Sequence, residues 1–85
     1  MEVYFKPTFI RKLKSLEPAL QEEVLEKIEL FKDERNHKQL KVHKLHGFLL
    51  GRCGFSVNYK TRIVFSYLSK KEAVLLAVGD HEIYK

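Results

Sequence analysis

The sequence predicts an α+β domain in which a pair of helices packs on an antiparallel sheet, in the order β-α-α-β-β-β. Two prolines in the first quarter of the chain are each followed by apolar residues at helical spacing. The second half instead shows alternating or continuous apolar runs separated by short polar turns, the pattern of consecutive strands. The chain has 85 residues, of which 45% are hydrophobic, and this suits a single domain over residues 1–85.

The first third of the chain predicts one strand and two helices. Residues 1–6 alternate in polarity and predict a short strand, whose place in the sheet the sequence leaves open. Pro7 and Pro18 each suit the first turn of a helix, because proline lacks an N–H and has a preset φ. Apolar stripes follow them: Phe9, Leu13 and Leu16 in the first helix, and Leu20, Val24, Leu25, Ile28 and Phe31 in the second. We expect two antiparallel helices joined by a tight proline turn.

The rest of the chain predicts a three-stranded meander. Residues 36–50 show no sustained period and are expected to form an ordered connection. A strand follows, in which alternate side chains share a face: Cys53, Phe55, Val57 and Tyr59. Turns at 60–61 and 69–71 bound a second strand over 62–68, and residues 73–78, apolar on both faces, predict an inner strand. Gly79 is expected to end that strand and leave 80–85 as a short tail.

The net charge of +5 lies entirely in the second half of the chain. Residues 1–40 hold eight basic and eight acidic side chains, whereas residues 41–85 hold eight basic and three acidic ones. A one-sided excess of this kind favours a polyanion or an acidic protein as partner, with an ordinary solvated face as the alternative.

Several classes of protein are disfavoured by the composition. The single cysteine, Cys53, allows no disulfide within the chain and disfavours a thiolate zinc site. Because it alternates with Phe55 and Val57, it is expected to be buried. No segment resembles a signal peptide or a membrane span, so a cytoplasmic location without membrane contact is expected. Phosphate-binding glycine loops, metalloprotease motifs and clustered carboxylates are missing from the sequence, so no metal and no cofactor are expected.

The polar residues of the second half are therefore the candidate site. The predicted meander brings distant positions together, because each strand begins or ends beside its neighbour. Arg62 is the most informative residue, since it leads an otherwise apolar strand and its guanidinium needs partners or a target. An ion pair of Arg62 with Asp80 or Glu82 is the structural alternative.

The whole chain resembles the RelE/ParE superfamily of toxins from type II toxin–antitoxin modules. Besides the small basic size and the predicted strand order, the resemblance rests on local patterns: Phe9, Arg11 and Leu13 in F-x-K/R-x-L, H-K-L-H-G at 43–47, G-R-x-x-F-S-V at 51–57, Y-K-T-R-I-V-F at 59–65, and G-D-H-E-I-Y at 79–84. The RelE and YafQ branches, whose members cut messenger RNA in the ribosomal A site, are the most similar. The resemblance implies a RelE-like microbial ribonuclease fold.

The resemblance also implies roles for individual residues. Arg62 falls where the family stabilises the transition-state phosphate, and His81 matches a tail histidine that transfers protons. Tyr84 matches a terminal aromatic that orients the nucleotide, and His43 lies where relatives carry a proposed general base. The expected RNA- or phosphate-binding residues are Lys44, His46, Arg52, Lys60 and Lys85. Ser56, Asn58 and Lys60 depart from the family's pattern.

The expected activity is ribosome-dependent, metal-independent cleavage of messenger RNA. RNA supplies its own nucleophile, the 2′-OH, so the enzyme needs a base, a cation and an acid, and histidine can serve in either proton role. The expected partners are a cognate antitoxin with an acidic or amphipathic segment, the ribosome and mRNA, with DNA reached only through the antitoxin. The alternatives are a ParE-like gyrase poison that cuts no RNA, and an inactive homologue acting as a co-repressor with its antitoxin.

Overall fold

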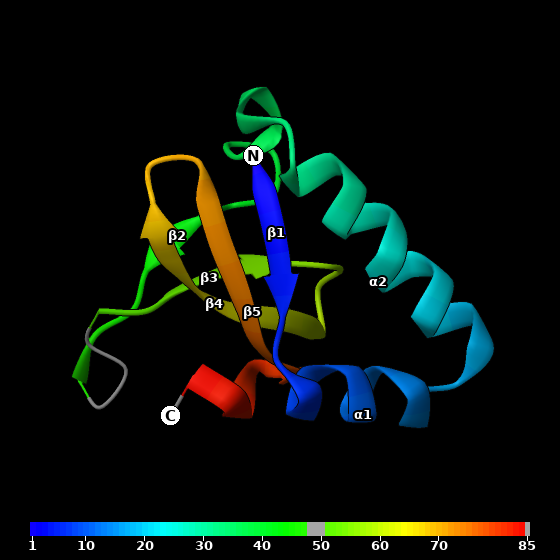
Figure 1. Ribbon diagram of the computed structural model, residues 1–85. Helices are drawn as coiled ribbons and strands as arrows, with labels where there is room; N and C mark the ends of the chain where they lie inside the picture. Colours follow the sequence, from blue (N-terminus) through cyan, green and yellow to red (C-terminus); the bar gives the residue numbers. More distant parts are fainter. Residues whose placement is uncertain (48–50, 85) are drawn as a thin grey trace.

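The computed structural model describes residues 1–47 and 51–84, and for His81 and Tyr84 it describes the backbone alone. Figure 1 shows a sheet with two helices on one side. The elements, in chain order, are β1 (Glu2–Phe5), α1 (Pro7–Ser15), α2 (Pro18–Phe31), the 3₁₀ helix η1 (Glu34–Asn36), β2 (His43–Lys44), β3 (Cys53–Ser56), β4 (Thr61–Ser69), β5 (Glu72–Asp80) and the 3₁₀ helix η3 (His81–Tyr84). The predicted α+β class is confirmed, and the predicted helices and strands occur in the predicted order, with β2 as an additional strand.

The sheet has the strand order β1-β5-β4-β3-β2. The meander β3-β4-β5 is antiparallel, as predicted, and β2 extends it at one edge. The first strand, whose place the sequence left open, joins the other edge parallel to β5, with Val3 opposite Ala73. The sheet is therefore mixed, because two helices lie between β1 and the meander and allow the chain to return in the same direction.

Both helices begin at their prolines, as predicted. In Figure 1, α2 runs diagonally along one face of the sheet and α1 crosses below the end of β5. Val24, Ile28 and Phe31 form the buried stripe of α2. Leu25 was expected in that stripe, and this is wrong: it is 47% exposed, because it lies one position away from the face that the stripe presents to the sheet.

The core between α2 and the sheet is built on aromatic rings. Phe9, Phe31, Phe55 and Phe65 are fully buried. The Phe31 ring stacks on Phe55 at 4.5 Å between centroids and meets Phe65 edge-on at 4.7 Å. Phe31 therefore attaches α2 to β3 and β4 together, and fixes which face of the meander is covered.

Four local expectations differ from the structure. The connection 36–50 contains the short strand β2, too brief to show a period. Tyr59 does not share the buried face of Cys53, because β3 ends at Ser56; Tyr59 is 84% exposed. The first hairpin turn lies at 57–60 rather than 60–61, since β4 begins at Thr61. Gly79 does not end β5, which continues to Asp80.

Within the residues described, no helix combines the length and apolar character needed to cross a membrane.

Candidate functional site

Arg62 lies on the sheet face opposite the helices. Its neighbour Ile63 is in the core, and side chains alternate along a strand, so Arg62 points to the other face. In the register of the sheet Arg62 lies between Ser56 of β3 and Gly79 of β5. The side chain is half-buried and forms part of the surface at this end of the sheet.

The guanidinium of Arg62 is held by backbone carbonyls. Its Nη1 donates to the carbonyl oxygens of Asn58 and of Thr61, the latter at 3.2 Å. The ion pair with Asp80 or Glu82 considered above is not found: among the described residues, no salt bridge involves Arg62. Neutral carbonyls orient the guanidinium without cancelling its charge, so the cation remains available to an anion.

Asn58 shapes the turn that supplies this anchor. Its Oδ1 accepts from the backbone N–H groups of Lys60 at 2.9 Å and Thr61 at 2.8 Å, which is an Asx-type turn. Its Nδ2 donates to Glu23 Oε1 on α2 at 2.7 Å. The turn is thereby fixed to α2, and the carbonyl that accepts from Arg62 is fixed with it.

His43 lies on the same sheet face as Arg62, two strands away. It pairs with Gly54, which pairs in turn with Val64, two residues after Arg62 on β4. The ring Nδ1 of His43 is 2.8 Å from the carbonyl oxygen of Lys41. A carbonyl only accepts, so Nδ1 carries the proton and the basic lone pair of the neutral ring is on Nε2.

The segment that carries the predicted tail residues folds beside Arg62. Gly79 is the register partner of Arg62, and a Cβ built on Gly79 would lie 2.8 Å from Ile83 Cγ2, so η3 packs directly against this glycine. Asp80 Oδ1 accepts from the N–H of Glu82 at 2.9 Å and begins the 3₁₀ turn. Figure 1 shows η3 at the end of β5. The side chains of His81 and Tyr84, and Lys85 as a whole, lie outside the described part of the protein, so their predicted roles stay predictions.

Gly79→Ala should destabilise the protein by about 1–3 kcal/mol, because the added methyl overpacks the contact with Ile83. Urea unfolding measures the loss. The double variant Gly79→Ala/Ile83→Ala removes the clashing side chain, so its loss should be smaller than the sum of the two single losses. Strictly additive losses would contradict the close packing of η3 on β5.

Three of the predicted RNA-binding residues lie around one hollow. Lys44, His46 and Arg52 line a cavity of about 440 Å³ at the β2 edge of the sheet, together with Cys53 and Tyr67. The N–H of Leu45 donates to the carbonyl oxygen of Arg52 at 2.9 Å and extends the β2–β3 pairing to the rim. Burial raises the pKa of the Cys53 thiol, an effect that Lys44 partly offsets. The sulfur is therefore neutral at pH 7, and the predicted burial of Cys53 is confirmed.

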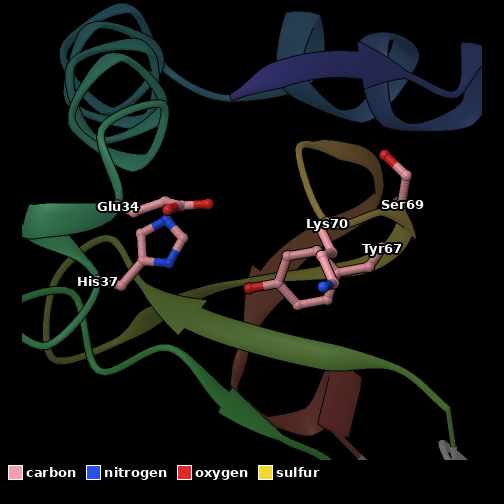
Figure 2. A pocket seen from close by; sticks show the side chains of 5 residues that line it. All are labelled: Glu34, His37, Tyr67, Ser69 and Lys70. Atoms are coloured by element: carbon pink, nitrogen blue, oxygen red, sulfur yellow. The ribbon is translucent and has the colours of Figure 1, made fainter.

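Tyr67 also lines a second hollow, of about 550 Å³. Figure 2 shows Glu34 and His37 on one side of it and Tyr67, Ser69 and Lys70 on the other. His37 Nε2 is 2.8 Å from the Phe31 carbonyl oxygen and the His37 ring stacks on Phe31, so this imidazole is fixed to the core. Burial, then nearby Cys53 and Glu34, raise the pKa of the Tyr67 phenol. Neither His43 nor Arg62 lines this hollow, and no sequence motif indicates it.

Lys60 lies apart from the hollow at the β2 edge. It is at the tip of the β3–β4 hairpin, with its ammonium 5.9 Å from the centre of the Tyr59 ring. The cavity that it lines also includes Glu17 and Glu23 of the helical side. The structure thus brings Lys44, His46 and Arg52 together, places His43 and Arg62 on one face, and puts Lys60 at a different cavity from the first group.

Comparisons with known proteins give matches among solved structures. YafQ from E. coli superimposes with a TM-score of 0.77 over 96% of this chain and 94% of its own, at 13% identity. The chain has the RelE toxin fold. The YoeB–YefM complex from Staphylococcus aureus matches with a TM-score of 0.72 at 15% identity, covering 95% of this chain and 97% of that one. The toxin–antitoxin complex RelBE2 from Mycobacterium tuberculosis matches with a TM-score of 0.71 at 21% identity, covering 94% and 96%.

The resemblance drawn from the sequence motifs is thereby confirmed as a likeness of fold, extending over nearly the whole of each chain. No family model and no curated protein matches the sequence.

Proposed function

We propose that this RelE-fold chain is the toxin of a type II toxin–antitoxin module and an endoribonuclease that cuts mRNA on the ribosome. The observation that carries the proposal is the state of Arg62. Its guanidinium is oriented by two backbone carbonyls and has no described carboxylate to neutralise it, and it lies beside the segment that carries His81 and Tyr84. The likeness of the fold to YafQ and to the toxin–antitoxin complexes supports the same assignment.

The proposed reaction is attack of a ribose 2′-OH on the adjacent phosphorus. A base takes the 2′-OH proton while the new O–P bond forms, and Arg62 stabilises the additional negative charge on the phosphoryl oxygens. The P–O bond to the 5′-oxygen then breaks, and an acid donates a proton to that oxygen. The products are a 2′,3′-cyclic phosphate and a 5′-hydroxyl. No metal or other cofactor takes part in this scheme.

The proton-transfer roles fall to the two histidines of the site. His43, with its basic lone pair on Nε2, and His81, at the start of η3, are the candidate base and acid. Tyr84 is the candidate platform on which the substrate base stacks. Lys44, His46 and Arg52, gathered at one cavity, are the candidate contacts to phosphates away from the cleaved bond, and Lys60 and Lys85 extend this proposal beyond the cavity.

The partners follow from the same assignment. The toxin would act in the cytoplasm on translating ribosomes and their mRNA, and would be neutralised by an antitoxin whose acidic or amphipathic segment covers basic surface. The concentration of the +5 charge in residues 41–85 supports such a partner. DNA would be reached only through the antitoxin.

Cleavage is tested in a cell-free translation extract programmed with one defined mRNA. The wild-type chain and Arg11→Ala, which removes an exposed cation of α1, should both create new 5′ ends in primer extension. These ends should accept phosphate from a polynucleotide kinase without prior dephosphorylation, because they are hydroxyls. The ends should vanish when initiation is blocked.

Two outcomes contradict the proposal. One is an unchanged pattern of 5′ ends during active translation. The other is inhibition of DNA gyrase supercoiling by the same preparation without RNA cleavage, which would favour the ParE-like alternative.

A further inference from the structure

A cationic hollow of about 300 Å³ lies beside the outer edge of β3, separate from the hollow that Lys44 lines. Three basic residues line it: Lys27 from α2, Lys41 from the chain before β2, and Arg62, whose guanidinium reaches back to the turn after β3. They come from segments far apart in the sequence. Arg62 belongs both to this hollow and to the proposed cleavage site, so the two are contiguous.

The positive charge of this hollow is poorly compensated. None of the described residues that line it is acidic. Lys27 Nζ is 3.6 Å from Glu26 Oε1, but that carboxylate is 69% exposed, and solvent screens such a pair strongly. Glu23, the other nearby acid on α2, accepts from Asn58. Within the residues that the structure describes, Lys41 and Arg62 form no salt bridge.

Lys41 has a backbone conformation that lysine rarely adopts. Its φ is +60°, and it is the only described non-glycine residue with positive φ. This left-handed conformation is unfavourable for a residue with a Cβ and free of strain for glycine. The backbone here is held by neighbours, since Lys41 N–H donates to Lys38 at 3.1 Å and Ser56 N–H donates to Leu40 at 2.9 Å. Glycine would adopt this backbone conformation without strain, so a lysine here indicates that the positive charge of its side chain has a function.

Tyr59 supplies an aromatic surface at the same place. It lines the hollow and is 84% exposed, although tyrosine is on average an intermediately buried residue. An exposed ring next to a row of cations is the arrangement by which proteins bind single-stranded nucleic acid, with bases stacked on the ring and phosphates on the cations.

We propose that this hollow binds the single-stranded RNA next to the cleaved linkage, with Lys27 and Lys41 on its phosphates and Tyr59 stacked on a base. The inference rests on the proposed function for its choice of RNA, and it extends the substrate path from Arg62 across the end of β3 toward α2. An acidic peptide segment would meet the same cations but would gain little from the exposed ring, so the geometry favours RNA.

The test measures binding without cleavage and without ribosomes. A fluorescently labelled 12-nucleotide RNA, 2′-O-methylated throughout so that no 2′-OH can attack, is titrated with the protein by anisotropy at several salt concentrations. The test variant is Lys27→Ala/Lys41→Gly, in which glycine keeps the left-handed backbone. The matched control is Lys12→Ala/Lys14→Ala, which removes two exposed cations from α1.

The test variant should weaken binding at least tenfold at low salt. It should also reduce the slope of log K against log salt by about 1.4, the value for two phosphate contacts to a single strand. Tyr59→Ala should weaken binding about 5- to 100-fold and leave the slope unchanged, because stacking releases no counterions. Lys41→Arg should retain wild-type affinity. Circular dichroism and thermal melting check that each variant is folded.

Three results would overturn the inference. The first is equal RNA affinity of the wild type and the Lys27/Lys41 variant, and the second is an equal loss of affinity in that variant and in the α1 control. The third is binding of a polyglutamate peptide through Lys27 and Lys41 while Tyr59→Ala leaves RNA affinity unchanged. The cleavage assay separates this inference from the proposed function. If the protein cleaves mRNA but its affinity for RNA does not change in the Lys27, Lys41 and Tyr59 variants, only this inference is wrong. If RNA affinity depends on these residues but no mRNA is cleaved, only the proposed function is wrong.

Discussion

Arg62→Ala should lower the single-turnover rate of message cleavage by about 10²–10³-fold, the usual effect of removing one preorganised group that stabilises transition-state charge. The geometry explains the size of the effect. Carbonyl oxygens of Asn58 and Thr61 already hold the guanidinium, so little reorganisation is needed when charge develops on the phosphate. The rate is measured by primer extension on stalled, mRNA-loaded ribosomes with the protein in excess.

Arg62→Lys separates charge from geometry. A lysine keeps the cation but is a compact point charge without the planar fork, so its rate should lie between those of the wild type and Arg62→Ala. Loss of the two carbonyl contacts could also loosen the hairpin, so thermal melting of both variants is the control, with Arg11→Ala as a matched loss of an exposed arginine. A folded Arg62→Ala that cleaves within twofold of the wild type would exclude Arg62 from the chemistry.

Phe31→Ala should destabilise the protein by about 3–5 kcal/mol, the largest loss expected from one truncation in this core. Phe31 is fully buried and its ring contacts the rings of Phe55, Phe65 and His37. Removing it leaves a cavity between α2 and the meander and breaks several aromatic contacts at once. Urea unfolding measures the change in midpoint.

Leu25→Ala is the control for this prediction. It lies on the same helix, but because it is 47% exposed the expected loss is below about 1 kcal/mol. The predicted loss at Phe31 is a large part of the total stability of a small domain, so Phe31→Ala could unfold outright. Phe31→Leu, which keeps most of the volume, should then give a folded protein with a loss of about 1–2 kcal/mol. Equal losses at Phe31 and Leu25 would mean that Phe31 is not the attachment point of α2.

The helices and the meander were predictable because their signals are local. Pro7 and Pro18 mark the first turns of the two helices, and the apolar spacing of Val24, Ile28 and Phe31 identifies the buried face of α2. Leu25 was wrongly predicted to be buried. It lies about 100° around the helix axis from Val24, and the apolar residues of a short helix do not define the edge of the buried face that closely. Its exposure follows from the direction in which α2 packs.

Features that depend on contacts between distant segments could not be predicted from the sequence. The parallel pairing of Val3 with Ala73 needs the two helices to return the chain along the sheet, and nothing in residues 1–6 states which edge they join. Gly79 resembles a strand end in the sequence. In the structure it stays in β5 and leaves room for Ile83, a reason that only the fold of η3 supplies.

Some residues of the candidate site were predicted from the sequence, and others were found only in the structure. Lys44, His46 and Arg52 were proposed as RNA-binding residues together with Lys60 and Lys85. The structure places the first three around one cavity, because they flank the neighbouring strands β2 and β3. Lys27, Lys41 and Tyr59 were not proposed. Lys27 resembles any solvated helix residue, Tyr59 was assigned to the buried face, and the positive φ of Lys41 has no signature in the residue type.

The parallel edge of the sheet has a consequence for biosynthesis. Because the chain is synthesised from its N-terminus, β1 (Glu2–Phe5) cannot pair with β5 (Glu72–Asp80) until β5 has been translated. Long-range pairing of this kind raises contact order and slows folding. The sheet can therefore close at this edge only after β5 has emerged from the ribosome, whichever strands pair earlier.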